Sequence, residues 1–137
     1  MRILIVEPER HPRIAEIPHT LEAMQQTVSG YIEITYPWRD PIALVCDEEG
    51  MLKQLLFNRL VSPQSAIFGT FFLCGIGEED LTDPPEELVD KYMRLLYDPQ
   101  MLIRTNAGYA VLPIPASDAP EGENEPVGGG DPDAVSQ

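Results

Sequence analysis

The stretch Ile42-Ala43-Leu44-Val45-Cys46 is a continuous apolar run between Pro41 and the acidic segment Asp47-Glu48-Glu49-Gly50. A short apolar run bounded by turn-forming residues is typical of a strand buried on both faces, since a half-exposed strand would alternate apolar and polar residues. We therefore predict a central strand at residues 42–46 and a turn directly after it.

The residues before this run supply further strands. Residues 3–6 form a short apolar strand, and residues 13–17 alternate weakly, as expected for its partner in a hairpin. Residues 31–36 alternate in polarity with Ile32 and Ile34 on one side, which predicts a half-buried strand. Three strands are therefore expected ahead of the central one.

A short helix is predicted between these strands, starting after Thr20. Threonine is a good N-cap because its hydroxyl accepts a hydrogen bond from a main-chain N–H of the first turn. Leu21, Met24 and Val28 are spaced so that they share one face of this helix. Gly30 is suited to the left-handed conformation in which helices commonly end.

Two further patterns follow the central strand. Leucines at positions 52, 55, 56 and 60 predict a short helix or a packed loop, which Ser62-Pro63 ends. Residues 66–76 are mostly apolar and predict one long strand, with Gly69 inside it as a bulge.

The best-defined helix is expected from Asp83 onward. The segment Asp83-Pro84-Pro85-Glu86 offers an acidic N-cap, a proline in the first helical position and a glutamate in the third. Residues 101–104 and 109–114 then form a hairpin. The buried stripe of the helix is predicted to consist of Leu88, Tyr92, Leu95 and Leu96.

These elements predict an α+β domain at residues 1–112, with a small mixed or antiparallel sheet and two or three short helices. Residues 113–137 hold six acidic and no basic residues, together with five prolines and four glycines. Such a segment cannot bury enough apolar surface to offset the entropy lost on ordering it. We expect it to be a disordered acidic tail.

The charge of the chain argues against two classes of partner. The sequence has 23 acidic and 9 basic residues and a net charge of -14. Phosphate backbones and anionic membranes attract clustered Lys and Arg, so we expect neither direct nucleic-acid binding nor membrane binding. No stretch approaches the roughly 18 apolar residues of a membrane span, and residues 3–6 are too short for a signal peptide. We expect a cytoplasmic protein.

The side chains that usually carry catalysis are poorly placed. Cys46 and Cys74 lie in apolar runs, where free thiols behave as small hydrophobic groups. His11 and His19 have no partner at a spacing typical of a zinc site. The chain has neither a G-x-S-x-G motif nor a phosphate-binding G-x-x-x-x-G-K-[ST] loop. We therefore predict no catalytic residue, no metal and no cofactor, and an enzyme is the least favoured function.

Asn58 and Arg59 form the predicted ligand site, together with Lys53. Lys53 and Arg59 are the only cations between residues 40 and 90, so an anion has few other places to bind there. An arginine fork beside an amide binds phosphate or carboxylate through paired hydrogen bonds. The alternative is that Arg59 forms an ion pair with a neighbour such as Glu49 while its stem covers core residues.

A second candidate surface is acidic. Seven acids and no base lie from Glu78 to Asp90, and three of the acids are spaced along one helix face. Acids on a rigid face can imitate a phosphate backbone, although the helix macrodipole also favours acids at an N-terminus. The predicted interaction residues are Glu78, Glu79, Asp80, Asp83, Glu87 and Asp90.

Several short motifs along residues 2–97 resemble one family. They are Arg2-Ile-Leu-Ile-Val-Glu-Pro8, Leu21-Glu-Ala23 with Gly30-Tyr-Ile-Glu33, and Ala43-Leu-Val-Cys46 followed by Glu48-Glu-Gly50, Asn58-Arg59 and Gly69-Thr70. Their order and spacing are similar to those of the DUF3846-like family, a domain of unknown function found in bacteriophages and conjugative elements. Residues 51–57 depart from it, because they lack the Gly and Pro of the family's loop. The resemblance implies a mobile-element setting and brings no catalytic residue.

We expect a non-catalytic accessory protein of a phage or mobile element that binds a host protein or a small anionic, nucleotide-like ligand and counters host defence. The alternative is an acidic DNA mimic that blocks a nucleic-acid-binding defence protein. We also expect a homodimer or a partner-bound state, because two helices on one face of so small a sheet would leave part of the other face bare.

Overall fold

The sheet at the centre of the protein has six strands, and its pairings are antiparallel. The structure, a computed structural model, describes residues 1–117. The strands lie in the order β2-β1-β7-β4-β3, and the short β8 pairs with the end of β7. Their bounds are Arg2–Val6 for β1, Arg13–Glu16 for β2, Ile32–Thr35 for β3, Ile42–Asp47 for β4, Phe71–Ile76 for β7 and Leu81–Thr82 for β8.

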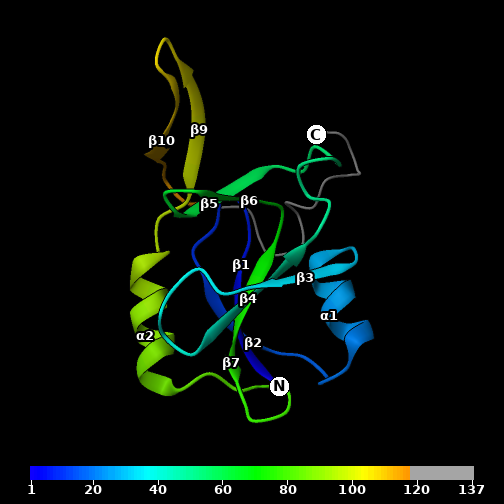
Figure 1. Ribbon diagram of the computed structural model, residues 1–137. Coiled ribbons are helices and arrows are strands. Elements are labelled where there is room, and N and C mark those ends of the chain that lie inside the picture. The colour runs from blue at the N-terminus through cyan, green and yellow to red at the C-terminus, as the bar shows by residue number, and fades with distance from the viewer. Residues whose placement is uncertain (118–137) are drawn as a thin grey trace.

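β4 and β7 run side by side through the middle of this sheet (Figure 1). Every residue of β4 is buried, and the register places Ala43 opposite Cys74 and Leu44 opposite Leu73. The prediction of a central strand at residues 42–46 is therefore confirmed. The predicted hairpin of β1 with β2 is confirmed as well.

The two helices cover opposite faces of the sheet, as Figure 1 shows. α1 (Leu21–Val28) packs Met24 and Val28 against a face that includes Ile3, Ile5, Val45 and Phe72. α2 (Glu86–Leu95) and the residue after it pack Tyr92 and Leu96 against a face that includes Leu4, Val6, Leu44 and Phe71. The expectation that both helices would share one face is wrong, because the central strands are apolar on both sides and each face needs its own cover.

α1 is held at its ends by specific main-chain geometry. Thr20 is its N-cap, as predicted, and its hydroxyl accepts a 3.1 Å hydrogen bond from the N–H of Ala23. At the other end Ser29, rather than Gly30, takes the left-handed conformation, with φ 63°. Gly30 is required for a different reason, since a Cβ there would lie 2.5 Å from Oδ2 of Asp47.

The apolar run at residues 66–76 is two strands rather than one. Gly69, with φ 84°, turns the chain between β6 (Ser65–Phe68) and β7, and the two strands lie in different sheets. β6 pairs with β5 (Phe57–Ser62) in a separate two-stranded sheet. Glycine provides this turn at no steric cost, because it has no Cβ to clash at positive φ.

The leucines at positions 52, 55, 56 and 60 do not form a helix. Residues 51–54 are turns, and Leu60 lies in β5. Leu52 is 82% exposed and Leu56 is 46% exposed, so the spacing of these leucines does not mark a buried helix face. The packed loop of the prediction is closer to the structure than the helix.

α2 begins two residues later than predicted. Its N-cap is Pro85, which has no side-chain capping bond. Asp83 instead accepts a 2.8 Å hydrogen bond from the main-chain N–H of Arg2, so it ties the start of the helix to β1. The buried residues of this helix and its C-terminal cap are Val89, Tyr92 and Leu96, whereas Leu95 of the predicted stripe is 58% exposed.

The hairpin predicted near the end of the domain is present, and it projects from the rest of the protein (Figure 1). It consists of β9 (Gln100–Thr105) and β10 (Gly108–Pro113). Beyond it the N–H of Ser117 donates a 2.7 Å hydrogen bond to the main-chain oxygen of Glu9. The chain thus remains attached to the body past residue 112.

The fold class is α+β, as predicted, and its described sheets are antiparallel rather than mixed. The remainder of the predicted tail, residues 118–137, lies outside the described residues. No helix among residues 1–117 is long and apolar enough to cross a membrane.

Candidate functional site

The predicted ligand residues Asn58 and Arg59 lie side by side on β5, and neither has exposed surface. The amide nitrogen of Asn58 donates to the main-chain oxygens of Val6 at 2.9 Å and Gly69 at 2.8 Å. Its amide oxygen accepts a 2.9 Å hydrogen bond from Nη1 of Arg59. Asn58 therefore joins β5 to the end of β1 and to the turn before β7.

The guanidinium of Arg59 is bound by oxygens of the protein itself. Nε donates to the main-chain oxygen of Leu96 at 3.0 Å, and Nη2 donates to that of Arg10 at 2.7 Å. Burial lowers the pKa of Arg59 to about 10, a value at which the side chain is still cationic at neutral pH. Its hydrogen-bond partners among the described residues are carbonyl and amide oxygens, and Glu49 is not among them. This geometry holds three segments together and presents no guanidinium surface to a ligand.

Lys53, the third predicted ligand residue, lies away from Asn58 and Arg59. Its Nζ forms a 2.7 Å ion pair with the buried Oδ2 of Asp47 and donates to the main-chain oxygen of Ser29 at 3.4 Å. It lines a shallow pocket of about 540 Å³ beside α1, whereas Arg59 lies at the end of α2. Because the two helices cover opposite faces of the sheet, the structure does not bring Lys53 and Arg59 together.

The six acids of the predicted interaction surface are all exposed. Glu78, Glu79 and Asp80 lie in the loop between β7 and β8, and the other three lie at the start of α2 and along it. Two of the six also have partners among residues 1–117. Asp80 is 3.4 Å from Nε2 of His19, and Asp83 accepts the main-chain N–H of Arg2.

The two thiols are buried in the sheet. Burial raises the pKa of Cys46 to about 11 and that of Cys74 to about 12. Both thiols are therefore protonated at neutral pH, which makes them poor nucleophiles. Among residues 1–117, no group of three or more His, Cys, Asp and Glu side chains is arranged to hold a metal ion.

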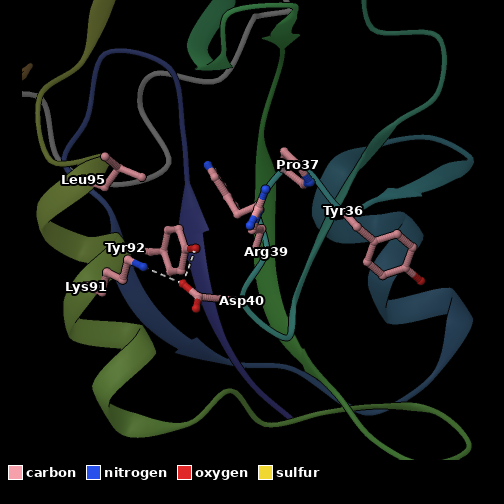
Figure 2. A pocket seen from close by; sticks show the side chains of 8 residues that line it. Tyr36, Pro37, Arg39, Asp40, Lys91, Tyr92 and Leu95 are labelled. Atoms are coloured by element: carbon pink, nitrogen blue, oxygen red, sulfur yellow. Dashed lines mark hydrogen bonds and ion pairs between the residues drawn. The ribbon is translucent and has the colours of Figure 1, made fainter.

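A pocket of about 520 Å³ lies between the segment that precedes β4 and one side of α2 (Figure 2). The two segments are far apart in the sequence, and the turn between β3 and β4 is confined by Pro37 and Pro41. The residues that line the pocket are Tyr36, Pro37, Trp38, Arg39, Asp40, Lys91, Tyr92 and Leu95. We refer to it below as the Trp38 pocket.

Asp40 connects the two walls of the Trp38 pocket. One oxygen of its carboxylate, Oδ2, accepts hydrogen bonds from Nζ of Lys91 at 2.6 Å and from the hydroxyl of Tyr92 at 2.7 Å, and Figure 2 shows both side chains pointing toward it. These bonds lower the pKa of Asp40, so the carboxylate is ionised at neutral pH. The other oxygen, Oδ1, accepts no hydrogen bond from the residues that the structure describes.

Trp38 and Tyr92 form a rigid aromatic wall. Their ring centroids are 4.5 Å apart at an interplanar angle of 39°. The indole Nε1 of Trp38 donates a 3.0 Å hydrogen bond to the main-chain oxygen of Val61, and the hydroxyl of Tyr92 is fixed by Asp40. Because both rings are held at their polar ends, the wall is formed before any ligand arrives.

Arg39 is the available cation of the Trp38 pocket. Its side chain is exposed, and it forms no hydrogen bond or ion pair with any residue that the structure describes. Tyr36 beside it is 60% exposed. The pocket therefore combines a free guanidinium, an exposed aromatic ring and an ionised acceptor.

The sequence contains one signal for this pocket that the predictions did not use. Trp38 is the single tryptophan of the chain, and it is followed by Arg39 between two prolines. A tryptophan next to an arginine in a restricted loop is a common composition of binding surfaces. The partners on α2 could not be found this way, because they reach the loop only through the tertiary fold.

Comparison with known proteins gives one match. No curated protein and no solved structure matches the chain. One family, described as Domain of unknown function (DUF3846), matches residues 1–97. The matched segment includes the sheet, both helices and the whole of the Trp38 pocket. This agrees with the resemblance found in the sequence motifs, and the chain belongs to the DUF3846 family.

Proposed function

We propose that this protein is a non-catalytic accessory protein of a phage or mobile element, and that the Trp38 pocket binds a small anionic, nucleotide-like ligand. The observation that carries the proposal is Arg39, an exposed arginine without a partner among the described residues, in a protein of net charge -14. On such a protein an anion is repelled from most of the surface and is retained where a cation is held in place.

Each wall of the pocket has a defined part in this proposal. The guanidinium of Arg39 binds a phosphate or carboxylate through paired hydrogen bonds. The exposed ring of Tyr36 offers a surface for stacking a planar base. The free Oδ1 of Asp40 accepts a hydrogen bond from an amino or hydroxyl group of the ligand. A nucleoside monophosphate offers all three complementary groups.

The proposal of a non-catalytic role is supported by the state of the groups that could start a reaction. Asp40 has a lowered pKa and is held by Lys91 and Tyr92, so it is a weak base at neutral pH. The thiols of Cys46 and Cys74 are buried and protonated. The pocket has the groups for binding and lacks an activated nucleophile among its lining residues.

The biological setting is the part of the proposal that rests on the family resemblance. The sequence motifs resemble those of a family found in phages and conjugative elements. The proposed role against host defence rests on that setting. Binding of a nucleotide-like ligand is compatible with it, because no reaction is required of the protein.

Calorimetric titration of the full chain with AMP, GMP and inorganic phosphate tests the proposed site. We expect a nucleotide to bind, and Arg39→Ala to weaken its affinity about ten- to hundredfold, the usual effect of losing a charge-assisted bond. Arg104→Ala is the matched control, because Arg104 is also exposed and without a partner among residues 1–117. Absence of nucleotide binding, or an equal loss in both variants, would overturn the assignment.

A second candidate function is an acidic mimic of DNA, and the exposure of all six acids from Glu78 to Asp90 favours it. The two functions differ in their response to salt. The affinity of a DNA mimic for a DNA-binding protein should fall steeply with salt, as that of DNA does. Replacing Glu87 and Asp90 by Gln and Asn should weaken such binding and leave nucleotide binding in the Trp38 pocket unchanged.

A further inference from the structure

The strand β3 forms one edge of the large sheet, because it pairs with β4 on one side and ends the order of strands. The main-chain N–H of Glu48 donates a 3.0 Å hydrogen bond to the main-chain oxygen of Tyr31, which sets the alternation of the pair. Hydrogen-bonded and non-hydrogen-bonded positions alternate along antiparallel strands. Ile32 and Ile34 therefore point their N–H and C=O groups away from β4, and the residues that the structure describes form no hydrogen bond with these groups.

The side chains along this edge leave it accessible. Tyr31 is 69% exposed and Ile34 is 37% exposed. The strand at the other end of the sheet, β2, begins with Arg13 and lies between Pro12 and Pro18, and charges and prolines of this kind protect an edge from further pairing. β3 contains neither a proline nor a basic residue. Its open edge can therefore accept another strand.

Acidic residues surround the start of β3. Glu33 lies within the strand, and Glu48 binds Tyr31 through the main chain. Glu22 and Glu49 line the pocket beside α1, which Tyr31 also lines. All four acids are exposed, and the lysine of this pocket is already paired at 2.7 Å with a buried carboxylate. A strand that adds to this edge therefore meets negative charge.

This charge makes a second copy of the chain a poor partner for the edge. An antiparallel twofold pairing that uses all the free main-chain groups places Ile32 of one copy opposite Ile34 of the other. Glu33 of each copy then faces Glu33 of the other at a non-hydrogen-bonded position, where opposite side chains are closest. Like charges directly opposite each other destabilise a strand pair, whereas opposite charges stabilise it.

We propose that β3 docks an extended basic segment of a partner protein, which adds to the sheet as an antiparallel strand. A Lys or Arg of the segment lies opposite Glu33, and the residues on either side of it exchange main-chain hydrogen bonds with Ile32 and Ile34. A second basic residue, two positions further on, lies opposite Tyr31, whose ring binds cations, and beside the two acids of the pocket. This surface takes a protein segment and is distinct from the proposed anion site of the Trp38 pocket.

NMR spectroscopy of the full chain with a short peptide tests the edge. The probe is acetyl-Thr-Val-Arg-Val-Arg-Thr-amide, and a matched peptide has Glu in place of both Arg residues. We expect the Arg peptide to bind and the Glu peptide not to bind. Hydrogen exchange at the amides of Ile32 and Ile34 should slow, because both amides gain acceptors. Methylation of the two valine nitrogens of the Arg peptide should abolish binding, since it removes the donors to the oxygens of β3.

A charge reversal tests the pair at the centre of the edge. Glu33→Arg should weaken binding of the Arg peptide roughly tenfold and should allow the Glu peptide to bind. Glu87→Arg is the matched control, because it makes the same change of charge at an exposed position of α2. This control should bind the Arg peptide as the wild type does, and circular dichroism should show that both variants are folded.

Several results would overturn the proposal. The first is unchanged exchange at Ile32 and Ile34 with the Arg peptide at millimolar concentration. Equal binding of the two peptides, or an equal effect of Glu33→Arg and Glu87→Arg, would show that the contact is not specific to β3. Protection of the two amides that rises with protein concentration in the absence of peptide would assign the edge to a second copy and overturn the proposal as well.

Discussion

Nε of Arg59 donates a 3.0 Å hydrogen bond to the main-chain oxygen of Leu96, which is the C-terminal cap of α2. This contact joins the two-stranded sheet β5–β6 to the helix that covers one face of the large sheet. Nη2 of the same guanidinium reaches the main-chain oxygen of Arg10, in the loop between β1 and β2. One buried side chain thus connects parts of the fold that share no regular secondary structure.

The first prediction follows from this contact. Arg59→Ala should lower the free energy of unfolding by at least about 3 kcal/mol, because it removes several charge-assisted bonds and leaves buried carbonyl oxygens without donors. Urea denaturation of the two proteins measures the difference. Arg104→Ala, at an exposed position, should change stability by no more than about 0.5 kcal/mol. Similar stabilities of the two variants would show that Arg59 is not a structural residue.

The second prediction concerns the end of α1. Ser29 has a left-handed backbone with φ 63°, which is unfavourable for a residue with a Cβ. Ser29→Gly should therefore stabilise the protein by about 0.5–1 kcal/mol. Gln26→Gly, in the exposed middle of the same helix, should instead cost about 1 kcal/mol. Thermal unfolding of both variants checks the sign, and a loss of stability in Ser29→Gly would contradict the prediction.

The third prediction concerns the acid sensitivity of the Trp38 pocket. Lys91 and Tyr92 hold the pKa of Asp40 below its usual value. A carboxyl of this kind stabilises the fold above its unfolded pKa of about 3.9 and loses that contribution as the pH falls through the lower folded value. The difference in melting temperature between the wild type and Asp40→Asn should be constant above about pH 5 and should shrink below about pH 4.

A control variant separates this effect from general acid unfolding. Glu48→Gln changes an exposed carboxyl whose side chain makes no hydrogen bond or ion pair with residues 1–117. The difference in melting temperature between the wild type and Glu48→Gln should not change in the same way below about pH 4. An equal change of melting temperature in both variants would mean that Lys91 and Tyr92 do not stabilise the ionised form of Asp40.

The fourth prediction concerns the cysteines. Burial raises the pKa of Cys46 to about 11 and that of Cys74 to about 12, so neither thiolate is populated at neutral pH. Thiol reagents should label both residues only as fast as the protein unfolds. Denaturant should therefore accelerate labelling as much as it accelerates unfolding. Rapid labelling of either thiol in the native protein would contradict the burial of these strands and return a nucleophilic role to consideration.

Local patterns in the sequence were sufficient for several elements. The apolar run at residues 42–46, the cap at Thr20 and the hairpin near the end of the domain were predicted correctly. In each case a few neighbouring residues determine the element, either because they form a cap or turn or because they make a continuous apolar run. The break at Gly69 was missed because the residues on both sides of it are apolar, and polarity does not show that a chain leaves one sheet for another.

The candidate site depended on information that local patterns do not contain. Arg59 was predicted at a binding surface because few other cations lie near it in the sequence and because a guanidinium beside an amide can bind an anion. The structure instead buries it beneath carbonyl oxygens from distant segments. Asp40 and Lys91 form their ion pair only because α2 packs beside the loop that precedes β4. Neither the burial of Arg59 nor the pairing of Asp40 with Lys91 can be predicted without the tertiary fold.

The order of strands in the large sheet has a consequence for synthesis of the chain. β1 ends at residue 6 and lies between β2 and β7, but β7 begins only at residue 71. While the chain emerges from the ribosome, the hairpin of β1 with β2 must wait with one edge of β1 unpaired and with the face of β1 that α2 packs against, which includes Leu4 and Val6, uncovered. Pairings of such long sequence separation fold slowly, and unpaired apolar edges favour aggregation in the interval. Nascent chains released before residue 76 should therefore be insoluble or held by chaperones, and solubility should appear once β7 is available to close the sheet.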